Sequence, residues 1–366
     1  MTQRQQKLTR TAPRIVGVDV FCGVGGLTHG LFRGGVHVAA GIDIDPSCRY
    51  PFEANNSAIF LERDVAELTA EEIACYYEGA DLSLLAGCAP CQPFSTYSRS
   101  GRNSEYEAQW PLALAFGRLA NSIKPDLITM ENVPQFANHP VFDRFLDSLS
   151  DYQQWWAIVD CASLGVPQTR KRLVFLASRL GGKAIELAQV DSRSRSVRET
   201  IGGLAPLKAG QSHPSDPLHM SSSLSPLNLQ RIKASRPGRT WRDWPPQLQA
   251  ACHRKSTGAT YPSVYGRMEW DRPAPTITTQ CFGYGNGRFG HPEQDRAISL
   301  REAAMLQTFP ETYAFAPAGE PIKFNKMGRL IGNAVPVRLG EVIAQSLINH
   351  INTGSSAKRT KRKLSR

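Results

Sequence analysis

The sequence predicts an α/β fold in which a doubly wound, largely parallel sheet is joined to a smaller irregular domain. Between residues 15 and 177, short apolar runs alternate with amphipathic stretches, a repetition typical of βαβ units. From residue 181 to about residue 292 the alternation stops, and Ser, Pro, Gly, Arg and Trp predominate. A stretch of that length is too long to be one loop of a compact domain, so it predicts a second domain.

Six runs have the length and composition of strands. They are residues 15–20, 36–42, 82–86, 126–130, 155–159 and 173–177. Four intervening stretches have helical periodicity, at residues 25–32, 47–55, 112–123 and 141–149. Ligands of such sheets bind beyond the carboxyl ends of the strands, so the residues that follow each strand are the first candidates for a site.

Helical periodicity returns near the end of the chain, at residues 299–306 and 337–351. The last of these helices is amphipathic, and we expect it to pack on the first domain, which would make the irregular domain an insertion. The predicted units are a disordered basic start (1–13), the first domain (14–180), the irregular domain (181–292), a return to the first domain (293–353) and a disordered basic tail (354–366).

Composition is that of an ordinary globular chain, with 41% hydrophobic and 20% charged residues among 366. No run approaches the roughly 18 apolar residues of a membrane span, and the basic start lacks the apolar core of a signal peptide, so we expect an intracellular protein with no membrane partner. The net charge of +11 favours a polyanionic partner, because cations that neutralise phosphates release counterions.

Eight cysteines lack the regular spacing of a disulfide framework, which predicts reduced thiols. Cys88 and Cys91 form a Cys-x-x-Cys pair that could be a redox pair or half of a zinc site. A structural zinc needs a second pair of ligands, and the nearest candidates, Cys252 and His253, are adjacent rather than spaced for one. We therefore expect no metal.

Two reactive side chains directly follow predicted strands. Cys91 lies in the run GCAPCQPFS after residues 82–86, and Glu131 follows residues 126–130. A thiol that adds to an electron-poor ring, together with an acid that relieves the resulting charge, is what makes an unreactive pyrimidine carbon accept a methyl group.

The first strand runs into a glycine turn at residues 18–26, where Gly23 and Gly25 allow close approach of a cofactor. The turn does not match Gly-x-Gly-x-x-Gly, so no dinucleotide fingerprint is present. Asp43 follows the second strand and is either an acceptor for ribose hydroxyls or the acid at a helix N-terminus. Asp64 is either a partner for an adenine amino group or part of a surface turn.

Ordered blocks of the sequence resemble those of the DNA (cytosine-5) methyltransferases of the bacterial modification type. The blocks are FCGVGG (21–26), PCQ (90–92), ENV (131–133), QTRKR (168–172), RE (301–302) with LQTFP (306–310), and GNAVP (332–336). The resemblance covers nearly the whole chain except the irregular region and both ends. It implies a Rossmann-like S-adenosylmethionine-dependent methyltransferase core, with a mixed, mostly parallel sheet, and a target-recognition domain at residues 181–292.

The resemblance also implies a role for each matching position. Cys91 would attack carbon 6 of cytosine while Glu131 bonds ring nitrogen 3 and the exocyclic amine. Arg170 and Arg172 would lie near the flipped base and its phosphates, although an ion pair with a neighbouring carboxylate is the alternative for Arg172. S-adenosylmethionine, released as S-adenosylhomocysteine, would be bound by Phe21, Gly23, Gly25, Asp43, Ile44, Asp64, Pro90 and Asn333, with Ile44 packed on the adenine.

Reaching a stacked cytosine requires rotating it out of the duplex, and we expect the polar, basic loop at residues 96–109 to close over the DNA. This loop lacks the Asp-x-Arg pair usual in the family. In the recognition domain, Arg231 and other basic residues are interleaved with Trp241 and Trp244, a mixture suited to phosphates and base edges. Thr276-Ile277 resembles the family's Thr-Leu pair. The expected DNA contacts are Ser95, Arg99, Arg102, Arg236, Arg239 and Thr276.

Three other functions compete with this interpretation. A tRNA cytosine-5 methyltransferase shares the core, but has a shorter variable region and a Cys-Phe-Thr element that this sequence lacks. A catalytically silent DNA-binding adaptor would have lost the thiol or the acid, and a nicotinamide dehydrogenase would have the glycine fingerprint. We expect a monomer that methylates double-stranded DNA in a restriction-modification system, cytoplasmic and associated with the nucleoid, with any cognate endonuclease acting separately.

Overall fold

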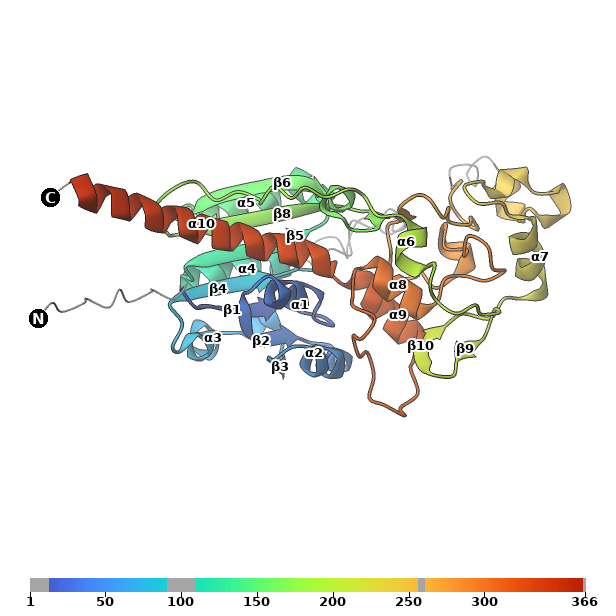
Figure 1. Cartoon of the computed structure of the whole chain (residues 1–366), viewed down its shortest axis with the longest axis horizontal. Helices are drawn as coiled ribbons and strands as arrows, with labels where there is room; N and C mark the ends of the chain where they lie inside the picture. The colour runs from blue at the N-terminus through green and yellow to red at the C-terminus, as the bar shows by residue number, and fades with distance from the viewer. Residues whose placement is uncertain (1–12, 91–109, 256–260, 365–366) are drawn as a thin grey trace, which may run out of the picture.

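The computed structural model describes residues 13–90, 110–255 and 261–364, with backbone alone at residues 110–111 and 354–364. A sheet with its helices forms one end of the elongated molecule, and an irregular region that includes α6 Val197–Ile201, α7 Pro226–Ala234, β9 Ser212–His213 and β10 Asp216–Met220 forms the other (Figure 1). Among the described residues, no helix has both the length and the apolar character needed to cross a membrane.

Seven strands form the main sheet, in the order β3-β2-β1-β4-β5-β8-β6. Their bounds are β1 Ile15–Val20, β2 His37–Asp43, β3 Ile59–Glu62, β4 Leu82–Gly87, β5 Leu127–Asn132, β6 Gln153–Asp160 and β8 Lys171–Ser178. Neighbouring strands from β3 to β5 are parallel, whereas β8 runs antiparallel to both β5 and β6. The predicted mixed, mostly parallel sheet is therefore confirmed.

The central strands are apolar along their whole length because helices cover both faces of the sheet. All six residues of β1 are buried, and so are all six of β5. Aromatic side chains such as Phe116 and Phe145 pack on one face, whereas Leu31 and Ile343 belong to the core of the other. The helices of this region are α1 Gly26–Arg33, α2 Arg49–Asn55, α3 Ala70–Ala74, α4 Trp110–Ile123, α5 Pro140–Ser148 and α10 Val337–Leu364.

Helix α10 packs against α1, as expected from its amphipathic sequence (Figure 1). The contact depends on glycine: a Cβ at Gly30 would lie 2.2 Å from the carbonyl oxygen of Val337, and one at Gly340 would lie 2.8 Å from that of Leu27. The final segment therefore packs on the first helix of the sheet region. Helix α10 also continues to Leu364, through residues whose composition predicts a disordered tail; Lys, Arg and Ala there are good helix formers.

The irregular region contains short elements and a small apolar core around Trp241 and Trp244. Its bounds are α6 Val197–Ile201, β9 Ser212–His213, β10 Asp216–Met220, α7 Pro226–Ala234 and β11 Ala274–Pro275, the last paired with β7 Gln168–Thr169. Trp241 and Trp244 are about 95% buried in this core, and the Arg231 guanidinium lies over the Trp244 ring and donates from Nε to the Leu248 carbonyl at 2.9 Å. These three residues thus stabilise the domain, which corrects the expectation that they face DNA.

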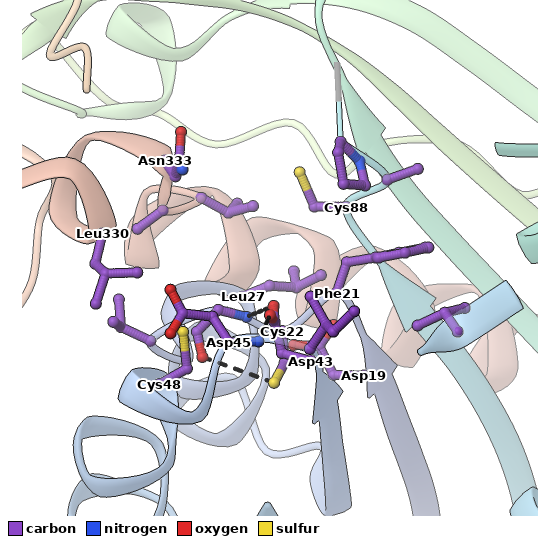
Figure 2. A pocket seen from close by; sticks show the side chains of 18 of the residues that line it. Asp19, Phe21, Cys22, Leu27, Asp43, Asp45, Cys48, Cys88, Leu330 and Asn333 are labelled. Atoms are coloured by element: carbon purple, nitrogen blue, oxygen red, sulfur yellow. Dashed lines mark hydrogen bonds between the residues drawn. The ribbon is translucent and has the colours of Figure 1, made fainter. Parts of the chain in front are cut away.

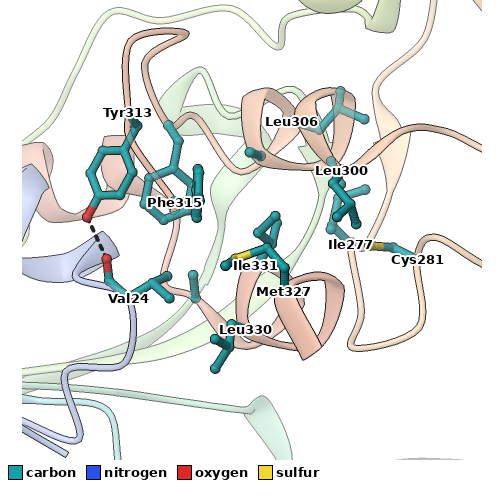
Figure 3. Close-up of a cluster of buried hydrophobic side chains, with 14 of the residues drawn as sticks. Val24, Ile277, Cys281, Leu300, Leu306, Tyr313, Phe315, Met327, Leu330 and Ile331 are labelled. Atoms are coloured by element: carbon teal, nitrogen blue, oxygen red, sulfur yellow. Dashed lines mark hydrogen bonds between the residues drawn. The ribbon is translucent and has the colours of Figure 1, made fainter. Parts of the chain in front are cut away.

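Helices α8 Leu300–Leu306 and α9 Phe324–Asn333 join the two parts of the molecule. Their apolar side chains share one buried cluster with Val24, from the turn after β1, and with Ile277, from the irregular region (Figure 3). The ion pair of Arg301 in α8 with Asp216 in the irregular region adds a polar connection, with N–O distances of 2.7 and 3.0 Å. The sheet and the irregular region are therefore held together by packed side chains.

Candidate active site

A cavity of about 380 Å³ opens beyond the carboxyl ends of β1, β2 and β4 (Figure 2). Residues from several separate parts of the chain line it. They include Asp19, Phe21, Gly23, Asp43, Ile44, Asp64, Cys88, Pro90, Leu330 and Asn333. The structure therefore has a cavity at the sheet edge where a ligand site is predicted from the sequence.

The turn between β1 and α1 forms one wall of the cavity. Phe21, Gly23 and Gly25 all have left-handed backbone, with φ of 59°, 53° and 86°. Phe21 and Gly23 line the cavity. Gly25 instead precedes α1 on the far side of the turn, where a Cβ would lie 2.9 Å from Asn56 Nδ2. Gly25 serves the backbone geometry of the turn.

Two aspartates at the cavity, Asp43 and Asp64, accept hydrogen bonds from backbone N–H groups. Asp43 accepts hydrogen bonds from the backbone N–H of Gly23 and of Asp45, each at 2.9 Å, and burial raises the pKa of its carboxyl group. Asp64 accepts from the N–H of Ala66 at 2.8 Å and so caps a short turn. Ile44, between them at the rim, is 67% exposed. An apolar side chain exposed beside two acids suits a flat aromatic ligand with donor groups.

Asp19 is a third acid in the cavity wall, and the sequence analysis did not single it out. Its side chain is 1% exposed, and Oδ2 accepts a 2.6 Å hydrogen bond from the Thr28 hydroxyl. Oδ1 is buried without a hydrogen-bond partner among the described residues. Burial raises the pKa of Asp19 to about 7. An unpaired acceptor in a cavity wall fits a ligand that donates a hydrogen bond there.

Glu131, at the end of β5, has a partner for each carboxylate oxygen. The Cys88 thiol donates to Oε2 at 2.8 Å, and the Arg172 guanidinium forms an ion pair with Oε1 at an Nε–Oε1 distance of 2.8 Å. Glu131 is 3% exposed and the Arg172 side chain 14%. The alternative interpretation of Arg172, an ion pair with a nearby carboxylate, is thus realised, and that carboxylate belongs to the candidate acid.

Arg170 lies deeper and connects three segments. It is 3% exposed, and its guanidinium donates to the carbonyl oxygens of Ile277 at 2.9 Å and Ala334 at 3.4 Å. Burial, together with the neighbouring charge of Arg172, lowers the pKa of Arg170 to about 10. Gln168 adds to this connection by accepting from the Ile277 N–H at 3.0 Å. The block QTRKR therefore fixes the end of the irregular region beside Glu131.

A second hollow, of about 520 Å³, lies on the irregular region next to this connection. Thr169, Glu269, Arg272, Thr276, Asn286 and Arg288 are among the residues that line it. Thr276 Oγ1 donates a hydrogen bond to the carbonyl oxygen of Thr169, the residue that directly precedes Arg170. Arg236 and Arg239 are exposed on the same region.

Several expected site residues lie outside the described part of the chain. These are Cys91, Ser95, Arg99 and Arg102, together with the whole loop at residues 96–109. Pro90, the last described residue before Cys91, lines the cofactor-sized cavity. Within residues 13–90, 110–255 and 261–364, no three His, Cys, Asp or Glu side chains are grouped so as to hold a metal.

Comparison with known proteins finds similarity along almost the whole chain. Residues 15–349 match the family model described as C-5 cytosine-specific DNA methylase. The Type II methylase M.HgiDII of Herpetosiphon aurantiacus is 51% identical over 336 residues, which cover 90% of this chain and 94% of that protein. The Type II methyltransferase M1.HphI of Haemophilus parahaemolyticus is 27% identical over 90% of this chain and 86% of its own.

Solved structures give the same fold. A crystal structure described as a DNA modification methyltransferase encoded in an E. coli prophage superimposes with a TM-score of 0.70 at 21% identity, covering 92% of this chain and 99% of that one. Spodoptera frugiperda DNMT2 superimposes with a TM-score of 0.61 at 18% identity, covering 91% of this chain and 99% of its own. At these identities the likeness concerns the fold alone.

Proposed function

The chain belongs to the C-5 cytosine-specific DNA methylase family, and we propose that Cys91 and Glu131 are the residues that carry out its methyl transfer. Family membership makes the protein a DNA (cytosine-5) methyltransferase, and the fold implies use of S-adenosylmethionine. The proposal rests chiefly on Glu131, a buried carboxyl group held by Arg172 and Cys88 beside the cavity.

The cavity fits the proposed cofactor. S-adenosylmethionine supplies an electrophilic methyl group and carries an ammonium group, ribose hydroxyls and an adenine ring. The unpaired Oδ1 of Asp19 suits a donor such as the ammonium group, and the exposed Ile44 suits the flat ring. Phe21, Gly23, Asp43, Asp64, Pro90 and Asn333 complete the proposed cofactor contacts, and Gly25 supports the turn that presents them.

In the proposed reaction, the Cys91 thiolate adds to carbon 6 of the flipped cytosine. Glu131 donates a proton to ring nitrogen 3 and accepts a hydrogen bond from the exocyclic amine, so that the ring electrons move to carbon 5. Carbon 5 would take the methyl group that S-adenosylmethionine supplies, with S-adenosylhomocysteine as the leaving group. Carbon 5 then loses its proton to water, the electron pair re-forms the C5–C6 double bond and expels the Cys91 sulfur as a thiolate, and nitrogen 3 returns its proton to Glu131. Arg172 orients Glu131 throughout, because its guanidinium is ion-paired with one carboxylate oxygen.

We further propose that residues 14–180 and 293–353 form the catalytic domain and residues 181–292 the target-recognition domain. The packing of α10 on α1 and the separate core around Trp241 support this division. The second hollow would contact the DNA beside the flipped base, because Thr276, which lines it, is hydrogen-bonded to Thr169, the residue before Arg170. The carboxylate, guanidinium and amide groups that line this hollow can bind base edges and phosphates. Ser95, Arg99, Arg102, Arg236 and Arg239 are the other proposed DNA contacts.

The biological setting we propose is restriction-modification, since the two bacterial relatives above are named Type II enzymes. The protein would act as a monomer on nucleoid DNA in the cytoplasm, without a metal and separately from any cognate endonuclease.

The test is methylation of plasmid DNA, with bulk tRNA as the competing substrate and radiolabelled cofactor as the reporter. The wild type should label DNA, and bisulfite sequencing should place the methyl groups on cytosines within one short sequence. Cys91→Ala should label neither substrate yet still bind the plasmid. Labelling of tRNA in preference to DNA would favour the tRNA enzyme, and methylation by Cys91→Ala would refute the nucleophile.

A further inference from the structure

Cys88 is a reactive side chain beside Glu131 that the proposed reaction does not use. Its Sγ lies 2.8 Å from Oε2 of Glu131, and its side chain also lines the cofactor cavity, where it is seen with Asn333 (Figure 2). Cys88 therefore lies at the boundary between the cavity and the proposed acid.

The backbone dictates this contact. Strands β4 and β5 are parallel, and Ala86 and Gly87 pair with Thr129 and Met130. The next residues in this register are Cys88 and Glu131, and side chains paired in this way project from the same face of a sheet. The proximity of the thiol to the carboxyl group is thus set by strand pairing rather than by a single side-chain rotamer.

The two partners of Glu131 differ in strength. Arg172 is permanently charged and is ion-paired with Oε1. A thiol is a weak donor, so the hydrogen bond from Cys88 to Oε2 is easily exchanged for a stronger one. Oε2 is the carboxylate oxygen that an incoming base can take over, because the other oxygen remains with Arg172.

We propose that Cys88 is a positioning residue for Glu131: its thiol holds the carboxyl group in its reactive orientation until cytosine enters, and then yields Oε2 to the base. This inference rests on the proposed function, in which Glu131 is the acid. Without the thiol, a nearly buried carboxylate oxygen would lack a donor in the base-free enzyme, and the carboxyl group would turn to find another partner.

The experiment compares variants of Cys88 that keep or remove the donor. In single-turnover methylation of plasmid DNA, Cys88→Ala should slow the chemical step about tenfold, the rate equivalent of one hydrogen bond to a charged group. Cys88→Ser keeps a hydroxyl donor and should recover to within about threefold of the wild type. Cys88→Val removes the donor without leaving a cavity, so its methylation rate should equal that of Cys88→Ala. It replaces Cys88→Ala in the comparison if the alanine variant has a lowered melting temperature.

Affinities separate positioning from binding. Because Cys88 lines the cofactor cavity, dissociation constants for S-adenosylmethionine and for plasmid DNA are measured for every variant, and both should stay within about twofold of the wild type. Cys75→Ala, which removes an exposed thiol that donates to the Glu72 carbonyl, is the matched control and should leave rate and affinities unchanged.

A double-mutant cycle identifies the residue through which Cys88 acts. In a Glu131→Ala background, Cys88→Ala should cost no further rate, because the group that the thiol positions is absent. An undiminished effect in that background, equal rates for the Ser and Ala variants, or a loss confined to cofactor affinity would overturn the inference. If Glu131→Ala itself methylates at the wild-type rate, the proposed acid fails instead, which is a separate result.

Discussion

Two carboxyl groups in the same site differ in the charge beside them. Each accepts one side-chain hydrogen bond and has one buried oxygen without a hydrogen bond among the described residues. That oxygen of Glu131 is ion-paired with Arg172, whereas Asp19 has no ion pair within the described part of the chain. Burial therefore dominates at Asp19 and raises its pKa to about 7. Asp19 therefore changes its protonation state near neutral pH.

Asp19 should make stability fall as pH rises. Its pKa is about 7 in the folded protein against a model value of 3.8, so between these values the folded state holds a proton that the unfolded state releases. Each pH unit in that window then costs up to about 1.4 kcal/mol of unfolding free energy. Asp19→Asn has no such proton. As pH rises from 5 to about 7.5, the melting temperature of Asp19→Asn should therefore increase relative to that of the wild type.

Thermal unfolding of both proteins across this range, without cofactor, measures the effect. Glu186→Gln, a change at an exposed carboxylate, provides the control and should follow the wild type at every pH. Wild-type and Asp19→Asn curves that stay parallel would contradict the shifted pKa.

Residue chemistry was only partly predictable from sequence. Cys91 and Glu131 could be proposed because each follows a strand and each has an obvious reactivity. Asp19 escaped notice because it lies inside an apolar strand, although its place one residue before the end of β1 was a usable signal. Cys88 was considered only as a partner of Cys91, since spacing along the chain says nothing of a neighbouring strand.

Strand order is what turns these residues into a site. Strand β8 lies between β5 and β6 and runs against both, so Val174 pairs with Glu131 and Arg172, two residues away, projects from the same face. The sequence predicted every strand of this sheet except β3, but it could not supply the strand order, because the order depends on contacts between segments some 40 residues apart. The ion pair of Arg172 with Glu131 depends on this strand order, because it requires β8 to lie beside β5.

The contact between α1 and α10 gives a prediction at the level of elements. Gly30→Ala should lower the free energy of unfolding by about 1–3 kcal/mol, because the added methyl group would meet the Val337 carbonyl, even though alanine favours helix by about 1 kcal/mol. Urea unfolding measures the difference. Gly203→Ala, where an added Cβ meets nothing within 4 Å, is the control. A Gly30→Ala protein as stable as the wild type would show that the helices can move apart.

Charge acts across the whole molecule. The net charge of +11 includes Arg236 and Arg239, both exposed on the irregular region. We expect DNA affinity to fall linearly with salt on logarithmic axes, and replacing both arginines with Gln should reduce the slope by about 1–2. Lys183→Gln, at an exposed lysine already paired with Glu186, should leave the slope nearly unchanged. Fluorescence anisotropy over a salt series measures each slope, and equal slopes for all three proteins would remove these arginines from the DNA interface.

The packing of residues 337–351 against α1 has a consequence for biosynthesis. While the ribosome is still translating the irregular region, Leu31, Val38 and Leu84 are already outside the exit tunnel, but the helix that buries them has not been made. We expect a nascent chain in that state to expose apolar side chains until residues 337–351 are made, and therefore to be prone to aggregation. Supplying residues 337–351 as a separate peptide during translation should shorten the time for which these apolar side chains are exposed.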